Sequence, residues 1–314
     1  MLSFMENAIF VTFLNSLSIL AVLIVFGYVA RKLGVLTDTI NAGMSTLLVK
    51  ITLPCTIFVS MLRPFTRTLL MESLATLLIS AAVYLSGYVI GMGLARLMNA
   101  ELEEKRVWQF ALVFANVGYM GFPIIYAVYG YEGMIYTTMA NVVFNILAFS
   151  LGVYLFKKDR DEEVRANLKL ALFNPALVAT YIGFFLFLTG LRPPEFIESG
   201  VGLVGGMTTP LSMLIVGSIL AKSRLLTLVN DPRVLPVIFM RLVGIPLVAL
   251  LVLRPFLHND VMLGVIVILA AMPVAALTVI FAEQYKGNTA VASKLVALSS
   301  LLCLFSIPLI SLLL

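Results

Sequence analysis

Long apolar stretches separated by short charged ones constrain this chain more than any other feature. Hydrophobic residues make up 61% of its 314 residues, and charged residues only 12%. Soluble domains carry about 25% charged residues, whereas a helix needs roughly 20 apolar residues to cross a bilayer. The first stretch, 8–30, has Glu6 before it and Arg31 and Lys32 after it, which reverses the charge order of a secretory signal. We therefore interpret the chain as a polytopic membrane protein whose first apolar stretch is a retained helix.

The apolar runs and helix breakers predict an all-α integral membrane protein with ten transmembrane helices. The one long polar segment, 157–169, leaves five spans on each side of it. Because five is odd, the second half must enter the membrane from the opposite side, which makes the halves inverted five-helix repeats. The expected domains are a first repeat at 1–157, a cytoplasmic linker at 158–167 and a second repeat at 168–314. The expected spans are 8–30, 38–62, 68–97, 104–129, 132–156, 168–189, 196–221, 232–256, 260–283 and 289–313.

The basic residues support this topology independently. Four arginines lie on one side of the predicted bundle, namely Arg63, Arg67, Arg192 and Arg254. Fourteen basic residues lie on the other side, namely Arg31, Lys32, Arg96, Lys105, Arg106, Lys157, Lys158, Arg160, Arg165, Lys169, Lys222, Arg224, Arg233 and Lys286. By the positive-inside rule the richer side is cytoplasmic. We expect a multi-pass protein of the plasma (inner) membrane, with both termini outside and the central loop in the cytoplasm.

Two apolar runs match in register half a protein apart. The first begins after Gly34 and reaches Pro54, and the second begins after Gly190 and reaches Pro210. Both pairs are 20 residues apart, and the offset between the pairs is 156. Interrupted apolar segments at corresponding positions of two halves are typical of secondary transporters built from repeats. We expect both runs to be broken at their prolines.

The expected fourth and ninth spans also contain helix-interrupting residues. The fourth holds Asn116, Gly118, Gly121 and Pro123, and the ninth holds Pro273. Unwound backbone at membrane depth persists only where protein or a watery cavity surrounds it. The N-terminal end of a half-helix has unpaired N–H groups and about half a positive charge, so two such ends meeting in mid-membrane would attract an anion. The alternative is that these prolines only kink two helices.

Three motifs resemble the bacterial and archaeal auxin efflux carrier family, whose plant relatives are the PIN-type auxin exporters. They are Asn-x-Gly-aromatic-x-Gly-x-Pro at 116–123, Leu-Pro-x-x-Ile-Phe at 53–58 and Ala-x-Pro at 271–273. The resemblance extends over the whole chain. It implies a scaffold of spans 1, 2, 6 and 7, and a moving unit of spans 3–5 and 8–10. In that moving unit the broken fourth and ninth helices cross at their prolines, and an elevator-type motion carries the crossover. The resemblance also implies a homodimer and a substrate carboxylate near Asn116.

The candidate substrate-binding residues come from these breaks and from neighbouring spans. Lys50 lies about midway along the second span with no acidic residue at matching depth. Either a bound anion compensates its charge, or its stem reaches an interface. Asn141 and Asn145 share one face of the fifth span, where interhelical hydrogen bonding is the alternative to lining a cavity. The full candidate set is Asn116, Gly118, Tyr119, Pro123, Pro273, Val274, Lys50, Pro54, Asn141 and Asn145.

Two further intramembrane cations, Arg241 and Lys294, have the same pair of interpretations, a functional role or snorkelling to an interface. Small residues four positions apart on a helix are expected to mark close packing against a neighbour. The chain has two pairs of this kind, Gly87/Gly91 and Gly202/Gly206.

A secondary active transporter or exporter of small organic anions, carboxylates, is the leading functional hypothesis. A sodium-coupled organic anion symporter related to bile acid carriers is the first alternative, although those relatives have a Glu/Gln cluster where this chain reads Ala-Met-Pro-Val-Ala-Ala. A transport-inactive ligand sensor and an integral membrane enzyme are the others. Cys55 and Cys303 share no metal-type spacing, and His258 is the only histidine. We therefore expect no catalytic residues, no metal and no cofactor. The expected partners are the organic anion and the lipid bilayer, and no nucleic acid.

Overall fold

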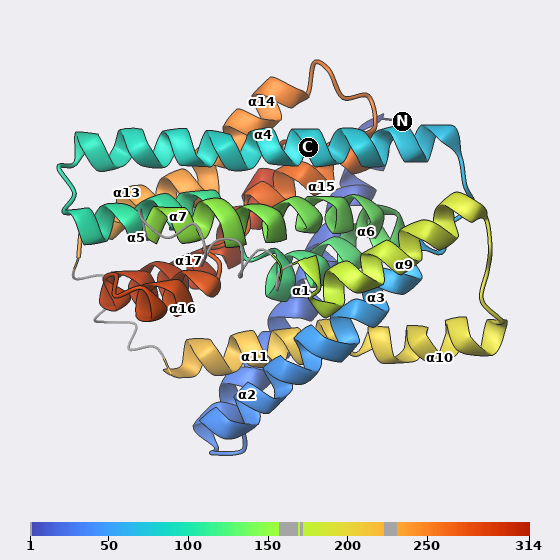
Figure 1. Ribbon diagram of the computed structural model, residues 1–314, viewed down its shortest axis with the longest axis horizontal. Coiled ribbons are helices and arrows are strands. Elements are labelled where there is room, and N and C mark those ends of the chain that lie inside the picture. The colour runs from blue at the N-terminus through green and yellow to red at the C-terminus, as the bar shows by residue number, and fades with distance from the viewer. Residues whose placement is uncertain (1, 157–168, 170–171, 223–230) are drawn as a thin grey trace. The chain divides into compact units, whose positions relative to one another are not determined.

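The computed structural model describes residues 2–156, 169, 172–222 and 231–314 (Figure 1). Regular structure in these residues is helical, apart from one isolated bridge between Ala115 and Val274. Seven helices within the described ranges are long and apolar enough to cross a bilayer, which agrees with the predicted class of all-α membrane protein. The expected linker at 158–167 lies outside the described residues.

Contacts divide the chain into two units. Unit 1 comprises Met1–Ala75, Gly118–Met139 and Phe173–Lys222, and unit 2 comprises Thr76–Val117, Ala140–Leu172 and Ser223–Leu314. Two long helices, α4 (Arg67–Leu97) and α6 (Phe122–Leu147), have residues in both units. The division does not follow the two halves of the sequence, since each unit contains segments from both.

Unit 1 contains the first two expected spans and the sixth and seventh. Its complete helices are α1 (Leu2–Lys32), α2 (Asp38–Leu47), η1 (Leu48–Thr52), α3 (Leu53–Met61), α9 (Pro175–Thr189), α10 (Glu195–Gly206) and α11 (Thr208–Lys222). Polar residues cap several of these helices: the side chain of Thr37 accepts a hydrogen bond from the N–H of Ile40, and Asn174 does the same for Leu177. Within this unit α3 packs along α9 (Figure 1).

The glycines that begin the two matched apolar runs have the same backbone conformation. The φ angle is 77° at Gly34 and 69° at Gly190. Gly190 terminates α9 in the left-handed conformation, and Gly34 lies two residues after the end of α1. Only glycine adopts positive φ without steric cost, so both positions need a glycine for the same physical reason.

The two matched runs differ at their prolines, which corrects the expectation of paired breaks. The second run is interrupted at Met207, between α10 and α11. The first run stays helical through η1, a π-helical turn in which the N–H of Leu53 donates to the carbonyl of Leu48, five residues back. Pro54 is the second residue of α3, directly after this turn, so the first run passes its proline without the interruption seen at Met207.

Glycines bring the backbones of α1 and α11 into contact. A methyl group added at Gly27 would lie 2.7 Å from the Cα of Leu214, and one added at Gly217 would lie 2.7 Å from the backbone nitrogen of Tyr28. Neither contact was predicted. The predicted pair Gly202/Gly206 instead faces open space, since an added methyl group at either position would meet nothing within 4 Å.

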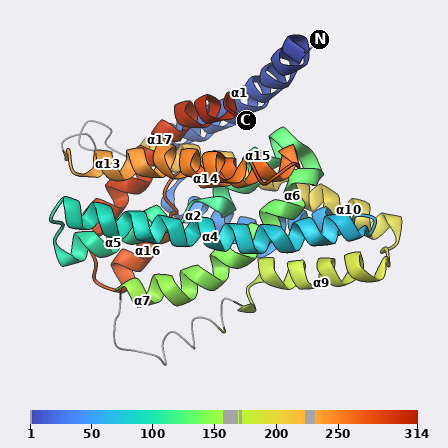
Figure 2. The same cartoon turned by 90° about the horizontal axis from the view of Figure 1, so that it is seen from above.

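Unit 2 contains the remaining helices apart from η2 (Val117–Gly121), which has residues in both units. They are α5 (Leu102–Val113), η3 (Ala148–Gly152), α7 (Val153–Phe156), α13 (Val234–Phe239), η4 (Met240–Gly244), α14 (Ile245–Leu253), α15 (Asp260–Ala270), α16 (Leu277–Gln284) and α17 (Thr289–Ser311). Asn259 and Asn288 cap α15 and α17 by accepting N–H bonds from Met262 and Val291. The helix α14 packs against α15 (Figure 2). An aromatic cluster centred on Phe110 and Phe281 fills the space between α5, α7 and α16.

Both helices that were expected to be broken are broken. α5 ends at Val113, Phe114 is extended with φ −102° and ψ 111°, and η2 (Val117–Gly121) then leads into α6. The break precedes Gly118 and Gly121, and Pro123 lies in the first turn of α6. Pro123 is therefore not the cause of the break, contrary to our expectation. A second interruption in this stretch is a single residue, Gly130, with φ 58° and ψ −149°. The other broken helix ends at Ala270 and resumes as α16 at Leu277.

Candidate functional site

The two broken helices of unit 2 meet at their breaks. The N–H of Asn116 donates to the carbonyl of Pro273 at 2.8 Å, and the N–H of Ala275 donates to the carbonyl of Phe114 at 3.0 Å. These bonds flank the bridge between Ala115 and Val274, which are 1% and 0% exposed. Buried backbone groups outside a helix need partners, and the two interrupted segments supply them to each other. We call this arrangement the crossover.

A serine from a third helix holds one strand of the crossover. The N–H of Val274 donates to the Ser299 hydroxyl at 3.0 Å, and that hydroxyl in turn donates to the carbonyl of Val296 in its own helix, α17. Ser299 is fully buried. The crossover is thus fixed from α17 as well as by its own two segments.

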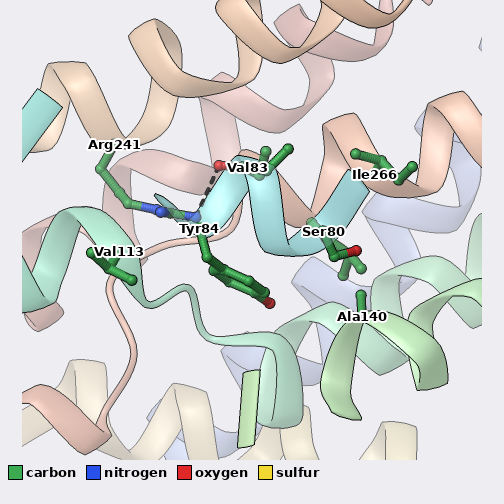
Figure 3. Close-up of a pocket in the computed structure, with 9 residues that line it drawn as sticks. Ser80, Val83, Tyr84, Val113, Ala140, Arg241 and Ile266 are labelled. Atoms are coloured by element: carbon green, nitrogen blue, oxygen red, sulfur yellow. Dashed lines mark hydrogen bonds between the residues drawn. The ribbon is translucent and has the colours of Figure 1, made fainter. Parts of the chain in front are cut away.

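Arg241 lies in η4 and its guanidinium reaches the ends of both broken helices. Its Nη1 donates to the carbonyl of Leu112 at 2.8 Å, near the C-terminus of α5. Its Nη2 and Nε donate to the carbonyls of Ala270 and Met272 at 3.0 and 3.1 Å, at the C-terminus of α15. Figure 3 shows the guanidinium beside Tyr84. Arg241 is 2% exposed. We expected either a functional role or a snorkelling side chain, and the depth of burial excludes snorkelling.

The helix α4 also packs closely against α5. A methyl group added at Gly87 would lie 2.5 Å from the carbonyl oxygen of Leu112, and one at Gly91 would lie 3.2 Å from the Cα of Gln109. This contact confirms the predicted role of the Gly87/Gly91 pair. The ring of Tyr84, one turn away on the same helix, lies 6.2 Å from that of Phe114 at the crossover.

A cavity of about 20 Å³ lies between Arg241, Tyr84, Ser80 and the end of α15 (Figure 3). A water molecule needs roughly 10–15 Å³, so this cavity has room for one water molecule. It is too small for an organic carboxylate.

The start of α16 offers two hydrogen-bond donors. Among the described residues, the N–H groups of Ala276 and Leu277 have no acceptor, whereas those of Thr278 and Val279 bond to carbonyls of the preceding turn. Ala276 and Leu277 are both half-buried. The N-terminus of a helix attracts an anion through such donors and through its dipole.

Five of the ten candidate residues belong to unit 2. Asn116, Pro273 and Val274 form the crossover itself, and the side chain of Asn116 is 8% exposed. Asn141 and Asn145 lie in the last two turns of α6, where the side chain of Asn145 donates to the carbonyl of Asn141 at 2.8 Å. These turns pack on the crossover through Phe144, whose ring lies 5.7 Å from that of Phe114.

The other five candidates, Gly118, Tyr119, Pro123, Lys50 and Pro54, belong to unit 1. The carbonyl of Tyr119 accepts a hydrogen bond from the hydroxyl of Ser212 in α11. Lys50 is exposed in η1, and the structure assigns it no ion pair among the described residues. Gly118 is half-buried, as is Pro54, and Pro123 is buried.

Sequence reasoning left the candidate set without Arg241 and Ser299. The signal for Arg241 was available, because two interrupted helices must leave C-terminal carbonyls that need a donor. A serine within an apolar helix such as α17 gives no comparable signal. Lys294 has an ordinary role, since its ammonium pairs with Asp231 at 3.3 Å in a partly exposed position.

Comparison with known proteins places these features in context. Residues 12–311 match the family model described as "Membrane transport protein". An "Uncharacterized transporter" of Methanothermobacter thermautotrophicus is 26% identical over 92% of this chain and 94% of its own length. The transporter MJ1031 of Methanocaldococcus jannaschii is 23% identical over 66% of the chain and 68% of its own length. The Escherichia coli K12 transporter YfdV is 20% identical over 95% and 96%, respectively.

Proposed function

Because the chain belongs to the membrane transport protein family, we propose that it is a secondary transporter of small organic anions, in particular carboxylates. The family membership agrees with the resemblance to auxin efflux carriers in the sequence. A multi-pass membrane protein of this family handles a substrate within a bilayer. The nature of that substrate is the part we infer from the crossover.

The observation that supports an anionic substrate is the pair of N–H groups at the start of α16. Ala276 and Leu277 directly follow the crossover and are half-buried, so a ligand can reach donors that the described protein residues leave unused. The N-terminal end of a helix carries about half a positive charge, and a carboxylate satisfies both the charge and the donors. Asn116 lies on the facing strand of the crossover, where its amide side chain is the group we assign to recognition.

The proposed architecture has ten spans arranged as two inverted repeats. Two features of the helices support the repeat. The positive-φ glycines are related by the offset of 156, and the same offset carries Val113, where α5 ends, to Leu269, one residue before α15 ends. The charge asymmetry described above supports an orientation with both termini outside the plasma membrane.

The proposed mechanism is alternating access of the elevator type. Unit 1 contains α1, α2, α3, α9, α10 and α11, which are the spans that the resemblance assigns to the scaffold. Unit 2 contains the crossover, Arg241 and Ser299, as a moving unit would require. Residues 118–139 group with unit 1 instead, so the moving unit we propose is smaller than spans 3–5 and 8–10. We propose a carrier rather than an enzyme on the basis of the family.

Uptake by proteoliposomes that contain the purified protein tests this proposal. The vesicles are preloaded with members of a panel of monocarboxylates and dicarboxylates, with and without sodium. We expect sodium-independent exchange of at least one acid, and the same acid should raise the thermal stability of the purified protein. If no acid is exchanged and none changes the stability, the proposal is wrong. Exchange that requires sodium would favour the symporter alternative.

The role of Asn116 is tested with the acid that gives the strongest exchange. Asn116→Ala should abolish most of the exchange while the protein is still produced and monodisperse, because it removes only an amide at the crossover. The matched control is Asn15→Ala, on the exposed side of α1, which should exchange like the unmodified protein. Normal exchange by Asn116→Ala would show that the side chain of Asn116 at the crossover does not recognise the substrate.

A further inference from the structure

We propose that Arg241 is the positioning residue of the crossover, because it joins the C-terminal ends of α5 and α15 and thereby sets the spacing of the two broken helices. This role concerns the protein's own backbone and can be tested without a substrate. Its consequence for transport rests on the proposed function, since the donors at Ala276 and Leu277 lie on a segment that Arg241 holds.

The first argument is the geometry of the three hydrogen bonds. Each nitrogen of the guanidinium donates once, to Leu112 in one segment and to Ala270 and Met272 in the other. The planar guanidinium holds these donors in a fixed fork, so the two segments that it binds are held at a fixed separation. A lysine ammonium is a compact donor on one nitrogen and cannot span the same three acceptors.

The second argument is the charge. Among the described residues, the hydrogen bonds of Arg241 go to backbone carbonyls, and none goes to a carboxylate. A charge buried at membrane depth is costly and needs compensation. Each helix C-terminus carries about half a negative charge, so the ends of α5 and α15 together match one arginine. The same pairing neutralises two like partial charges that would otherwise repel each other.

The third argument is the local structure that aims the side chain. Arg241 lies in η4, where the N–H of Ile245 donates to the carbonyl of Met240 five residues back. Such a π turn holds one more residue than an α turn, and one residue corresponds to about 100° around a helix. π turns inside α-helices occur often at functional sites. Here the turn includes the only charged side chain of α13, η4 and α14, and that side chain points to the crossover.

A disulfide at the bridge reports the spacing directly. The hydrogen bonds around Ala115 and Val274 make them a non-hydrogen-bonded antiparallel pair, whose Cα atoms lie about 4.5 Å apart, within the range that a disulfide needs. We would introduce Ala115→Cys and Val274→Cys in a background with Cys55→Ala and Cys303→Ala. Copper phenanthroline would start oxidation, and maleimide mass-tagging after denaturation would count the remaining thiols.

We expect the protein with Ala115→Cys and Val274→Cys, and with Arg241 intact, to form this disulfide readily. Arg241→Met should slow its formation by about tenfold or more, since a hydrogen bond to a charged group is worth at least that factor in an equilibrium. Arg241→Lys keeps the charge and should give an intermediate rate. The control is Arg254→Met, which removes an arginine of the same unit that donates to the exposed carbonyl of Leu313, and its rate should be unchanged. Equal rates in all variants would overturn the proposal.

Amide hydrogen exchange distinguishes positioning from a general loss of stability, and Arg241→Lys serves if Arg241→Met does not fold. Exchange should accelerate at 114–117 and 271–277 in the Arg241 variant and remain unchanged in α1 and α11. Uniform acceleration over the whole chain would show a merely structural role and overturn the proposal. Both measurements use the purified protein without substrate, so failure of the carboxylate proposal would leave them interpretable.

Discussion

Replacing Gly87 by alanine tests the contact on which the geometry of the crossover depends. The new methyl group would lie 2.5 Å from the carbonyl oxygen of Leu112, whereas ordinary contacts begin at 3.4 Å. The backbone of α5 or α4 must therefore move by about 0.9 Å. That carbonyl also accepts the hydrogen bond from Nη1 of Arg241, so the displacement disturbs the crossover and not only the helix packing.

Three terms set the size of the effect. Overpacking a close contact costs about 1–3 kcal/mol, and weakening a hydrogen bond to a charged group costs up to about 1.5–3 kcal/mol. The higher helix propensity of alanine offsets about 0.5–1 kcal/mol. With the hydrogen bond only partly weakened, we expect a net loss of about 2 kcal/mol, which lowers the unfolding midpoint of a chain of 314 residues by about 3 °C.

Two other glycines of α4 provide matched controls for Gly87→Ala. A methyl group at Gly93 would meet nothing within 4 Å, so Gly93→Ala should raise stability by about 0.5–1 kcal/mol through helix propensity. Gly91→Ala, with its closest contact at 3.2 Å, should fall between the two. The midpoint is the temperature at which half of the protein no longer elutes as a monodisperse peak in size-exclusion chromatography after heating. If Gly87→Ala is as stable as Gly93→Ala, the close approach of α4 to the Leu112 carbonyl is wrong.

Two further substitutions test the remaining contacts. Gly217→Ala should destabilise the protein by about 2 kcal/mol through overpacking against the α1 backbone. Gly43→Ala, at a position in α2 that faces open space, should not destabilise it. A loss of stability of equal size in both variants would refute the contact between α1 and α11. Ser299→Ala should cost about 1–3 kcal/mol because it leaves the buried N–H of Val274 without its acceptor. Amide exchange at Val274 should rise in that variant and stay normal in Ser150→Ala, which removes a hydroxyl that donates to the carbonyl of Ile146 one turn back. Unchanged exchange in Ser299→Ala would show that the Ser299 hydroxyl is dispensable.

The membrane class and the interrupted helices could be predicted from sequence because both rest on local signals. An apolar stretch fixes a spanning helix by length alone, and the cluster of Asn116, Gly118 and Pro123 cannot continue an undisturbed helix. The position of the break was less predictable. It begins at Phe114, an ordinary helix former, because the buried backbone there pairs with Pro273 and Ala275, which are more than 150 residues away in the chain.

The carbonyls that Arg241 binds and the close contacts of Gly27 and Gly217 could not be predicted, because both depend on contacts between distant segments. Gly202 and Gly206 have the spacing of a packing motif and face open space, whereas Gly27 and Gly217 lack a pairing in sequence and meet a neighbouring backbone. The π turn before Pro54 was equally hidden. A single extra residue lets the helix continue past the proline without a break.

The contacts of Gly27 and Gly217 between α1 and α11 limit how unit 1 can deform. The backbone of each helix contacts a glycine of the other. Sliding or rotating one helix against the other would bring a larger side chain into the same position, where it would clash with a peptide group. We therefore expect α1 and α11 to keep the same position relative to each other in every conformation that the protein adopts. A covalent link between α1 and α11 at this level should then leave the turnover of the protein unaffected.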